Sequence, residues 1–128
     1  DVFEDRLVLF LIHFAFFLKI YKNDENTKTL QKLYDFNFRQ LELSIREIGY
    51  GDQSINKKMK DYINLFHSII NKIDNWHLLN NSEKNEKINS LLNISDNNDL
   101  TVYFDKYSIE LQNNTLNFYL KGVLKPKK

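Results

Sequence analysis

The sequence predicts an all-α fold, a single compact bundle of about five to six helices. Apolar residues recur every three or four positions through most of the chain, which is the spacing of one face of an α-helix. The lone proline, Pro126, lies near the C-terminal end, so no proline interrupts an earlier helix. Hydrophobic residues make up 42% of the 128 residues, enough for the core of one domain. We expect this helical domain over residues 1–122 and a basic tail over 123–128.

The composition excludes several functional classes. The chain has no cysteine, which rules out a disulfide framework, a thiolate zinc site and a cysteine nucleophile. The formal net charge is +1, so overall charge favours neither a nucleic-acid partner nor an acidic substrate. The sequence begins with Asp1 rather than Met, which leaves room for residues upstream.

The first helix is expected from about Phe3 to Tyr21, and its centre, LVLFLIHFAFFLKI, is apolar on every side. A helix that spans a membrane needs about 20 apolar residues, and this run is shorter and contains His13. Two interpretations stay open: a buried central helix, or a surface that contacts a membrane or an apolar client. If it is a client surface, Phe10, Phe14 and Phe17 are the residues we expect to form it.

Two long amphipathic helices are expected next, over residues 27–48 and 55–76. The first has an apolar stripe formed by Leu30, Tyr34, Phe38, Leu41, Ile45 and Ile48. Leu33, Phe36 and Leu43 widen this stripe, so we expect the helix to pack against at least two neighbours. The second has a stripe formed by Ile55, Met59, Tyr62, Phe66, Ile69, Ile73 and Trp76.

Two further helices are expected in the C-terminal part. Ser82 is the predicted N-cap of a short helix, with Glu83 and Glu86 in its first turn, where acidic groups favour the helix dipole. The last helix is expected over residues 100–120. Its predicted inner face comprises Leu100, Tyr103, Phe104, Tyr107, Leu111 and Phe118.

Two of the three glycines, Gly49 and Gly51, stand between the two long helices. Gly49 occupies the position where a helix commonly ends in the left-handed conformation that glycine adopts most readily. We expect Gly51 to allow a second tight bend, and Asp52 or Ser54 to cap the following helix. The spacing is not that of a phosphate-binding loop.

Charged residues flank this turn: Arg46, Glu47 and Asp52, then Lys57, Lys58 and Lys60. The lysines are expected in the first turns of a helix, where cations are disfavoured, so stability alone does not account for them. The cluster is either a solvated face or a docking patch for an acidic partner or a lipid head group. Arg46, Glu47 and Asp52 have a simpler interpretation as an ion-pair network that fixes the turn.

The segment FNFRQLELSIREIGYGDQSINKKMKDYINLFHSII resembles the signature of the ubiquinol–cytochrome c chaperone family. The family pattern is L-R-E-M-G-V-G-D-x-S-V-x-K-K-M-K. The residues in register are Arg46, Glu47, Gly49, Gly51, Asp52, Ser54, Lys57, Lys58, Met59 and Lys60. The apolar first helix, with its internal histidine, is also similar to that of the family. The resemblance covers about residues 3–75 and is weak beyond Trp76.

This resemblance implies an all-α assembly factor for respiratory complex III that binds newly made cytochrome b. It implies a small co-chaperone and the ribosome as further partners, and peripheral contact with a membrane. The implied location is the bacterial cytoplasm beside the inner membrane, or the matrix side of the mitochondrial inner membrane. No direct contact with nucleic acid and no cofactor are expected.

Nothing in the sequence indicates catalysis. His13, His67 and His77 do not have metal-ligand spacing on one helix face, and no serine stands in a nucleophile elbow. We therefore expect no enzyme and no metal site. The alternative is a helical protein that binds a small molecule or lipid in an aromatic-lined cavity. A closed pocket with convergent polar groups would favour that alternative, and an open apolar groove beside the glycine turn would favour the chaperone.

Overall fold

The computed structural model describes residues 2–94 and 98–124, and within them the chain forms six α-helices and no strand. The helices are α1 (Val2–Tyr21), α2 (Thr27–Ile48), α3 (Asp52–Lys72), α4 (Asn81–Leu92), α5 (Asn98–Asn113) and α6 (Leu116–Leu124), with a short 3-10 helix η1 (Trp76–Leu78) after α3. The predicted all-α fold is confirmed. Residues 95–97, between the two expected C-terminal helices, and residues 125–128 of the expected tail lie outside the described part.

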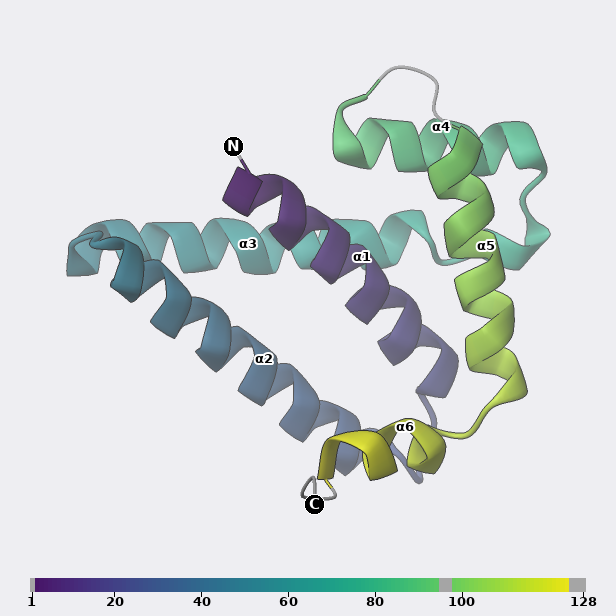
Figure 1. The fold of residues 1–128 in the computed structure, drawn as a ribbon, viewed down its shortest axis with the longest axis horizontal. Coiled ribbons are helices and arrows are strands. Elements are labelled where there is room, and N and C mark those ends of the chain that lie inside the picture. Colours follow the sequence, from purple (N-terminus) through teal and green to yellow (C-terminus); the bar gives the residue numbers. More distant parts are fainter. Residues whose placement is uncertain (1, 95–97, 125–128) are drawn as a thin grey trace.

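Helix α1 is the central element of the core. It packs against α3, α5 and α4, and in Figure 1 it crosses in front of α3 between α2 and α5. Four of its side chains are at most 1% exposed: Leu11, Ile12, Ala15 and Phe16. The apolar run is therefore a buried central helix. Among the described residues, no helix combines the length and the apolar character that crossing a membrane requires.

Helix α2 begins and ends where the sequence predicts, but it is covered on one side only. It packs on α3, and its direct contact with α1 is sparse. Leu30, Phe38, Leu41 and Ile45 are buried, whereas Phe36 is 57% exposed. The wide apolar face, which is expected to pack against at least two neighbours, is thus only partly buried, because Leu43 and Ile48 are also exposed.

Helix α3 begins three residues earlier than expected and ends at Lys72 rather than Trp76. Trp76 instead lies in η1, where it is 3% exposed. Its indole N–H donates a hydrogen bond of 3.0 Å to Asp105 of α5, and Lys84 of α4 donates one of 2.7 Å to the same carboxylate oxygen. The change from α-helix to 3-10 turn thus directs Trp76 into the core beside α5.

Helix α4 begins with a capping box at Asn80, two residues before the predicted cap. The side chain of Asn80 accepts a hydrogen bond of 2.8 Å from the Glu83 N–H, and Glu83 accepts one of 3.0 Å from the Asn80 N–H. The prediction of Ser82 as N-cap is wrong, because Ser82 already lies inside the helix.

The single last helix that the sequence predicts is divided into α5 and α6. The hydroxyl of Tyr21 donates to the carbonyls of Leu111 and Asn114, at 2.7 and 3.0 Å, which gives partners to carbonyls at the end of α5. Thr115 then accepts a hydrogen bond of 3.1 Å from the Phe118 N–H and starts α6. The predicted inner face is only partly correct, because Tyr103 is 48% and Phe118 is 59% exposed.

Candidate functional site

Helices α2 and α3 meet at a glycine corner, which we define as residues 46–54. Gly49 has φ +105°, and its N–H donates a hydrogen bond of 3.0 Å to the Arg46 carbonyl. The predicted left-handed helix end at Gly49 is confirmed. Gly51 is the N-cap of α3 in an extended conformation with φ −73°, which any residue can adopt, so the second special bend expected there is absent.

Asp52 is the first residue of α3, and neither it nor Ser54 forms the predicted side-chain cap. The Asp52 carboxylate instead accepts a hydrogen bond of 3.0 Å from Arg46 across the corner. The Arg46 guanidinium also lies 3.5 Å from Glu42, one turn back on α2. The hydrogen bond to Asp52 raises the pKa of Arg46, and the charge of Glu42 acts in the same direction. The ion-pair interpretation therefore holds for Arg46 and Asp52. The second carboxylate beside Arg46 is Glu42 rather than Glu47, which is exposed.

The three lysines after the corner lie farther along α3 than expected. Because the helix starts at Asp52, Lys57, Lys58 and Lys60 occupy its second and third turns. The unfavourable effect of the helix dipole on cations is largely confined to the first turn. Helix stability therefore does not disfavour these lysines, contrary to the expectation from the sequence. Lys58 lies over the ring of Tyr50 at 4.6 Å from its centroid, while Lys57 and Lys60 are exposed.

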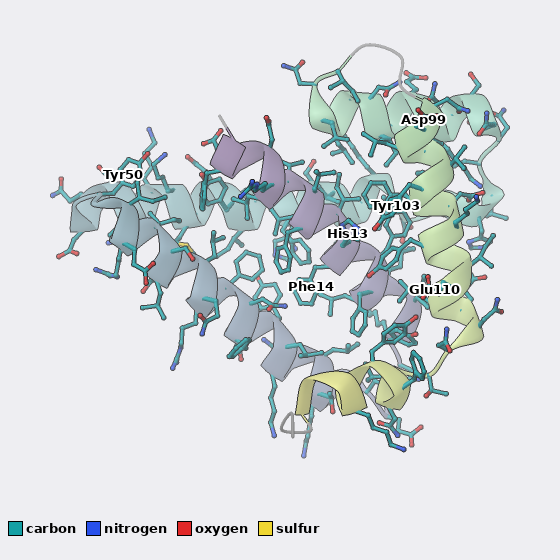
Figure 2. All side chains as sticks on the ribbon, in the orientation of Figure 1. His13, Phe14, Tyr50, Asp99, Tyr103 and Glu110 are labelled. Carbon is teal, nitrogen blue, oxygen red and sulfur yellow. The ribbon has the colours of Figure 1, made fainter. Side chains whose placement is uncertain are left out.

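The three phenylalanines proposed as a client surface differ in exposure. Phe10 is 45% exposed and Phe17 is half-buried. Phe14 is only 6% exposed and stacks on Phe66 of α3 at 5.4 Å between ring centroids. Figure 2 shows Phe14 between α1 and α2, in the interior of the protein. Phe14 therefore belongs to the core, and its assignment to an open surface is wrong.

An open groove of about 410 Å³ runs between the N-terminal half of α1 and the C-terminal half of α2. Its apolar lining comprises Phe3, Leu7, Phe10 and Leu41. Arg6, Asn37, Gln40 and Ser44 add polar groups along it. We call this the α1/α2 groove. Ser44 lies little more than one turn before Gly49, so the groove approaches the glycine corner.

Two further apolar residues of α2, Phe36 and Leu43, are exposed and do not line the groove. They are seven residues apart, which places them on one face of the helix two turns from each other. The sequence predicts that Phe36 and Leu43 belong to the packed apolar face of this helix. The signal that separates them from the buried stripe is their phase, because they fall on the side of α2 opposite Phe38 and Ile45.

The three histidines are distributed over separate elements. His13 of α1 is half-buried among aromatic rings of α5, and His67 and His77 are exposed. Within residues 2–94 and 98–124, no three His, Asp or Glu side chains lie close enough together to hold a metal ion.

The fold is all-α, and an open groove with a partly apolar lining lies near its glycine corner. Residues 1–78, more than half of the chain, match the Ubiquinol-cytochrome C chaperone family, and the chain belongs to that family. The resemblance seen in the sequence is thereby confirmed. No curated protein and no solved structure matches the chain.

Family membership supports a role as a chaperone in the assembly of ubiquinol–cytochrome c reductase, respiratory complex III. Such a role implies a client protein among the components of that complex. It also indicates an assembly factor rather than an enzyme. The matched residues contain α1, α2 and α3, and hence the whole α1/α2 groove and the glycine corner.

Proposed function

We propose that this protein holds newly made cytochrome b in the α1/α2 groove until the subunit enters complex III. The observation that carries this proposal is the position of the groove: an open apolar surface built wholly from residues that match the chaperone family. The groove is open rather than closed, which suits a polypeptide client better than an enclosed small molecule.

The chemistry of the groove fits one helix of a membrane protein. Such a helix presents a continuous apolar face, and a groove between two helices binds it through anchors about one turn apart. Leu7 and Phe10 of α1 are one turn apart on one wall of the groove, and Leu41 lies on the opposite wall.

The glycine corner has a supporting role in this proposal. The Arg46–Asp52 pair links the end of α2 to the start of α3, the helix on which α1 packs, and so connects the two walls of the groove through α3. The exposed Lys57 and Lys60 offer positive charge to an acidic partner or to anionic lipid head groups. We therefore also propose peripheral contact with the membrane into which cytochrome b is inserted.

The proposed location follows from the client. In a bacterium it is the cytoplasmic side of the inner membrane, and in a mitochondrion it is the matrix side. A small co-chaperone and the ribosome remain proposed partners, on the basis of the resemblance to mitochondrial members of the family.

The proposal is tested by co-expressing tagged chaperone variants with cytochrome b and measuring how much cytochrome b is recovered with each. Phe10→Asp should lower the recovery at least about tenfold, because a carboxylate in the groove opposes an apolar client. Ile109→Asp is the matched control, since Ile109 is 51% exposed on α5, away from the groove. Equal recovery with both folded variants would show that the groove does not hold the client.

The corner is tested in the same assay with Lys57→Glu combined with Lys60→Glu. If the lysines orient the complex, this charge reversal should lower cytochrome b recovery several-fold in a protein that keeps its normal melting temperature. Added salt should also lower the recovery of cytochrome b with the unmodified protein, because salt screens the charge of the lysines. Unchanged recovery would assign the lysines to an ordinary solvated face and leave the groove proposal standing.

A further inference from the structure

A second hollow lies between the end of α1, the start of α2 and the second half of α3. It has a volume of about 580 Å³, within the range of roughly 300–1,000 Å³ typical of small-molecule sites. It shares no lining residue with the α1/α2 groove. We call it the α2/α3 cavity.

The floor of the α2/α3 cavity is apolar and partly aromatic. It is formed by Leu18, Leu30, Tyr34, Phe66 and Ile70. Phe66 is fully buried and its ring lies 5.9 Å from that of Tyr34, so the deepest part of the cavity is walled by aromatic rings. Such a floor is suited to an alkyl chain, which gains free energy by leaving water.

The mouth of the cavity carries more positive than negative charge. Lys19 donates a hydrogen bond to Asp74, and this pair spans from α1 to the turn after α3. Lys22, a second lysine at the mouth, also lies near enough to Asp74 for its charge to act on that carboxylate. Two lysines against one carboxylate leave a net positive mouth.

We propose that the α2/α3 cavity binds a single-chain amphipathic carboxylate of the fatty-acid class. The alkyl chain lies on Tyr34, Phe66 and Ile70, and the carboxylate lies at Lys22. Lys19 keeps its bond to Asp74, so the ligand meets a cation that no carboxylate of the described residues engages at hydrogen-bond distance. This function is separate from the holding of a client in the groove.

The test is a calorimetric titration of the full chain with laurate below its micellar concentration. Dodecanol and dodecyltrimethylammonium serve as probes with the same chain but a neutral and a positive head. We expect laurate to bind at one site, and the cationic probe to bind at least about tenfold more weakly, a difference of about 1.4 kcal/mol. Equal affinity for all three would overturn the proposal and indicate an apolar surface without head-group selection.

Two variants locate the site. Lys22→Glu should weaken laurate binding at least about fivefold, whereas Lys32→Glu, an equally exposed change on α2 outside the cavity, should leave it unchanged. Ile70→Trp should abolish binding by filling the cavity, and its circular dichroism and melting temperature show whether it folds. If Lys22→Glu binds laurate as tightly as the unmodified chain, the proposal is wrong whatever Ile70→Trp does.

Recovery of cytochrome b separates this inference from the proposed function. Lys22→Glu should retain normal recovery, because Lys22 lies outside the α1/α2 groove. Phe10→Asp should retain normal laurate binding for the same reason. Loss of both activities in either variant would show that the two hollows form one site.

Discussion

His13 of α1 and Tyr103 of α5 are joined by a hydrogen bond of 2.6 Å between the ring Nε2 and the phenol oxygen. The other ring nitrogen, Nδ1, lies 2.7 Å from the Leu9 carbonyl, which can only accept, so Nδ1 carries the proton. In this tautomer Nε2 accepts from the Tyr103 hydroxyl, and Figure 2 shows the two residues facing each other between their helices. His13 is thus a satisfied structural histidine in the contact between α1 and α5.

This pairing predicts graded losses of stability. Tyr103→Phe removes one hydrogen bond and should lower the free energy of unfolding by about 0.5–1.5 kcal/mol. His13→Ala also removes edge-to-face ring contacts with Tyr103, Phe104 and Tyr107, and should cost about 2–4 kcal/mol. Urea denaturation followed by the single tryptophan measures both. Equal losses would mean that the ring contacts add nothing to the hydrogen bond.

The two glycines of the corner should respond differently to substitution by alanine. Gly49→Ala places a side chain at φ +105° and should destabilise the protein by about 1–3 kcal/mol. Gly51→Ala is the matched control, because its backbone is ordinary and an added Cβ meets no atom within 4 Å. Its effect should stay within about 1 kcal/mol. Thermal melts of the two variants measure these losses of stability. A larger loss for Gly51→Ala than for Gly49→Ala would contradict the assigned conformations.

The contacts of Phe66 predict which helix unfolds locally first. Its fully buried ring contacts Phe14 of α1 and both Tyr34 and Phe38 of α2. Phe66→Ala should cost about 3–5 kcal/mol in unfolding free energy. Because α2 rests mainly on α3, hydrogen exchange in this variant should accelerate more in α2 than in α5. Uniform acceleration across all helices would show that α2 does not open separately.

Three tyrosines predict a loss of stability at alkaline pH. Burial raises the pKa of Tyr21, Tyr62 and Tyr107 from 10.0 to about 12, and for Tyr62 the charge of Glu4, which accepts its hydroxyl hydrogen bond, adds to the effect. The folded state therefore holds these protons more tightly than the unfolded state. The resulting stabilisation is complete below pH 10 and is lost as the pH rises toward about 12.

Unfolding free energies measured at a series of pH values, together with tyrosinate absorbance, check this prediction. Tyr62→Phe should reduce the slope of the alkaline loss, since one of the tyrosines whose pKa is raised in the folded state is removed. A slope that does not change in this variant would exclude Tyr62 from the effect.

Much of the helical framework follows from the sequence because its signals are local. Both ends of α2 were predicted to the residue, and Gly49 alone fixes the second of them. The break between α5 and α6 was not predicted, because part of its cause is the Tyr21 hydroxyl, which reaches Leu111 and Asn114 from the other end of the sequence. A hydrogen bond between such distant residues leaves no periodic signal.

The candidate site was less accessible to prediction than the fold. Phe36 and Phe38 are two residues apart and of the same type, yet one is 57% and the other 7% exposed. Periodicity identifies the two faces of α2, but the coverage of each face depends on how many helices reach it. The corner was therefore predicted from Gly49, whereas the groove, which needs α1 and α2 to stand apart, emerged only in three dimensions.

The corner described above also has a mechanical consequence. Helices α2 and α3 diverge from the corner at an angle, and α1 lies across α3 (Figure 1). Because α1 packs on α3 and its direct contact with α2 is sparse, the angle between α2 and α3 sets the width of the α1/α2 groove. Gly49 and the Arg46–Asp52 pair lie at the vertex of this angle, so under the proposed function a change at the corner is expected to alter which helix fits the groove, although none of the three residues lines it.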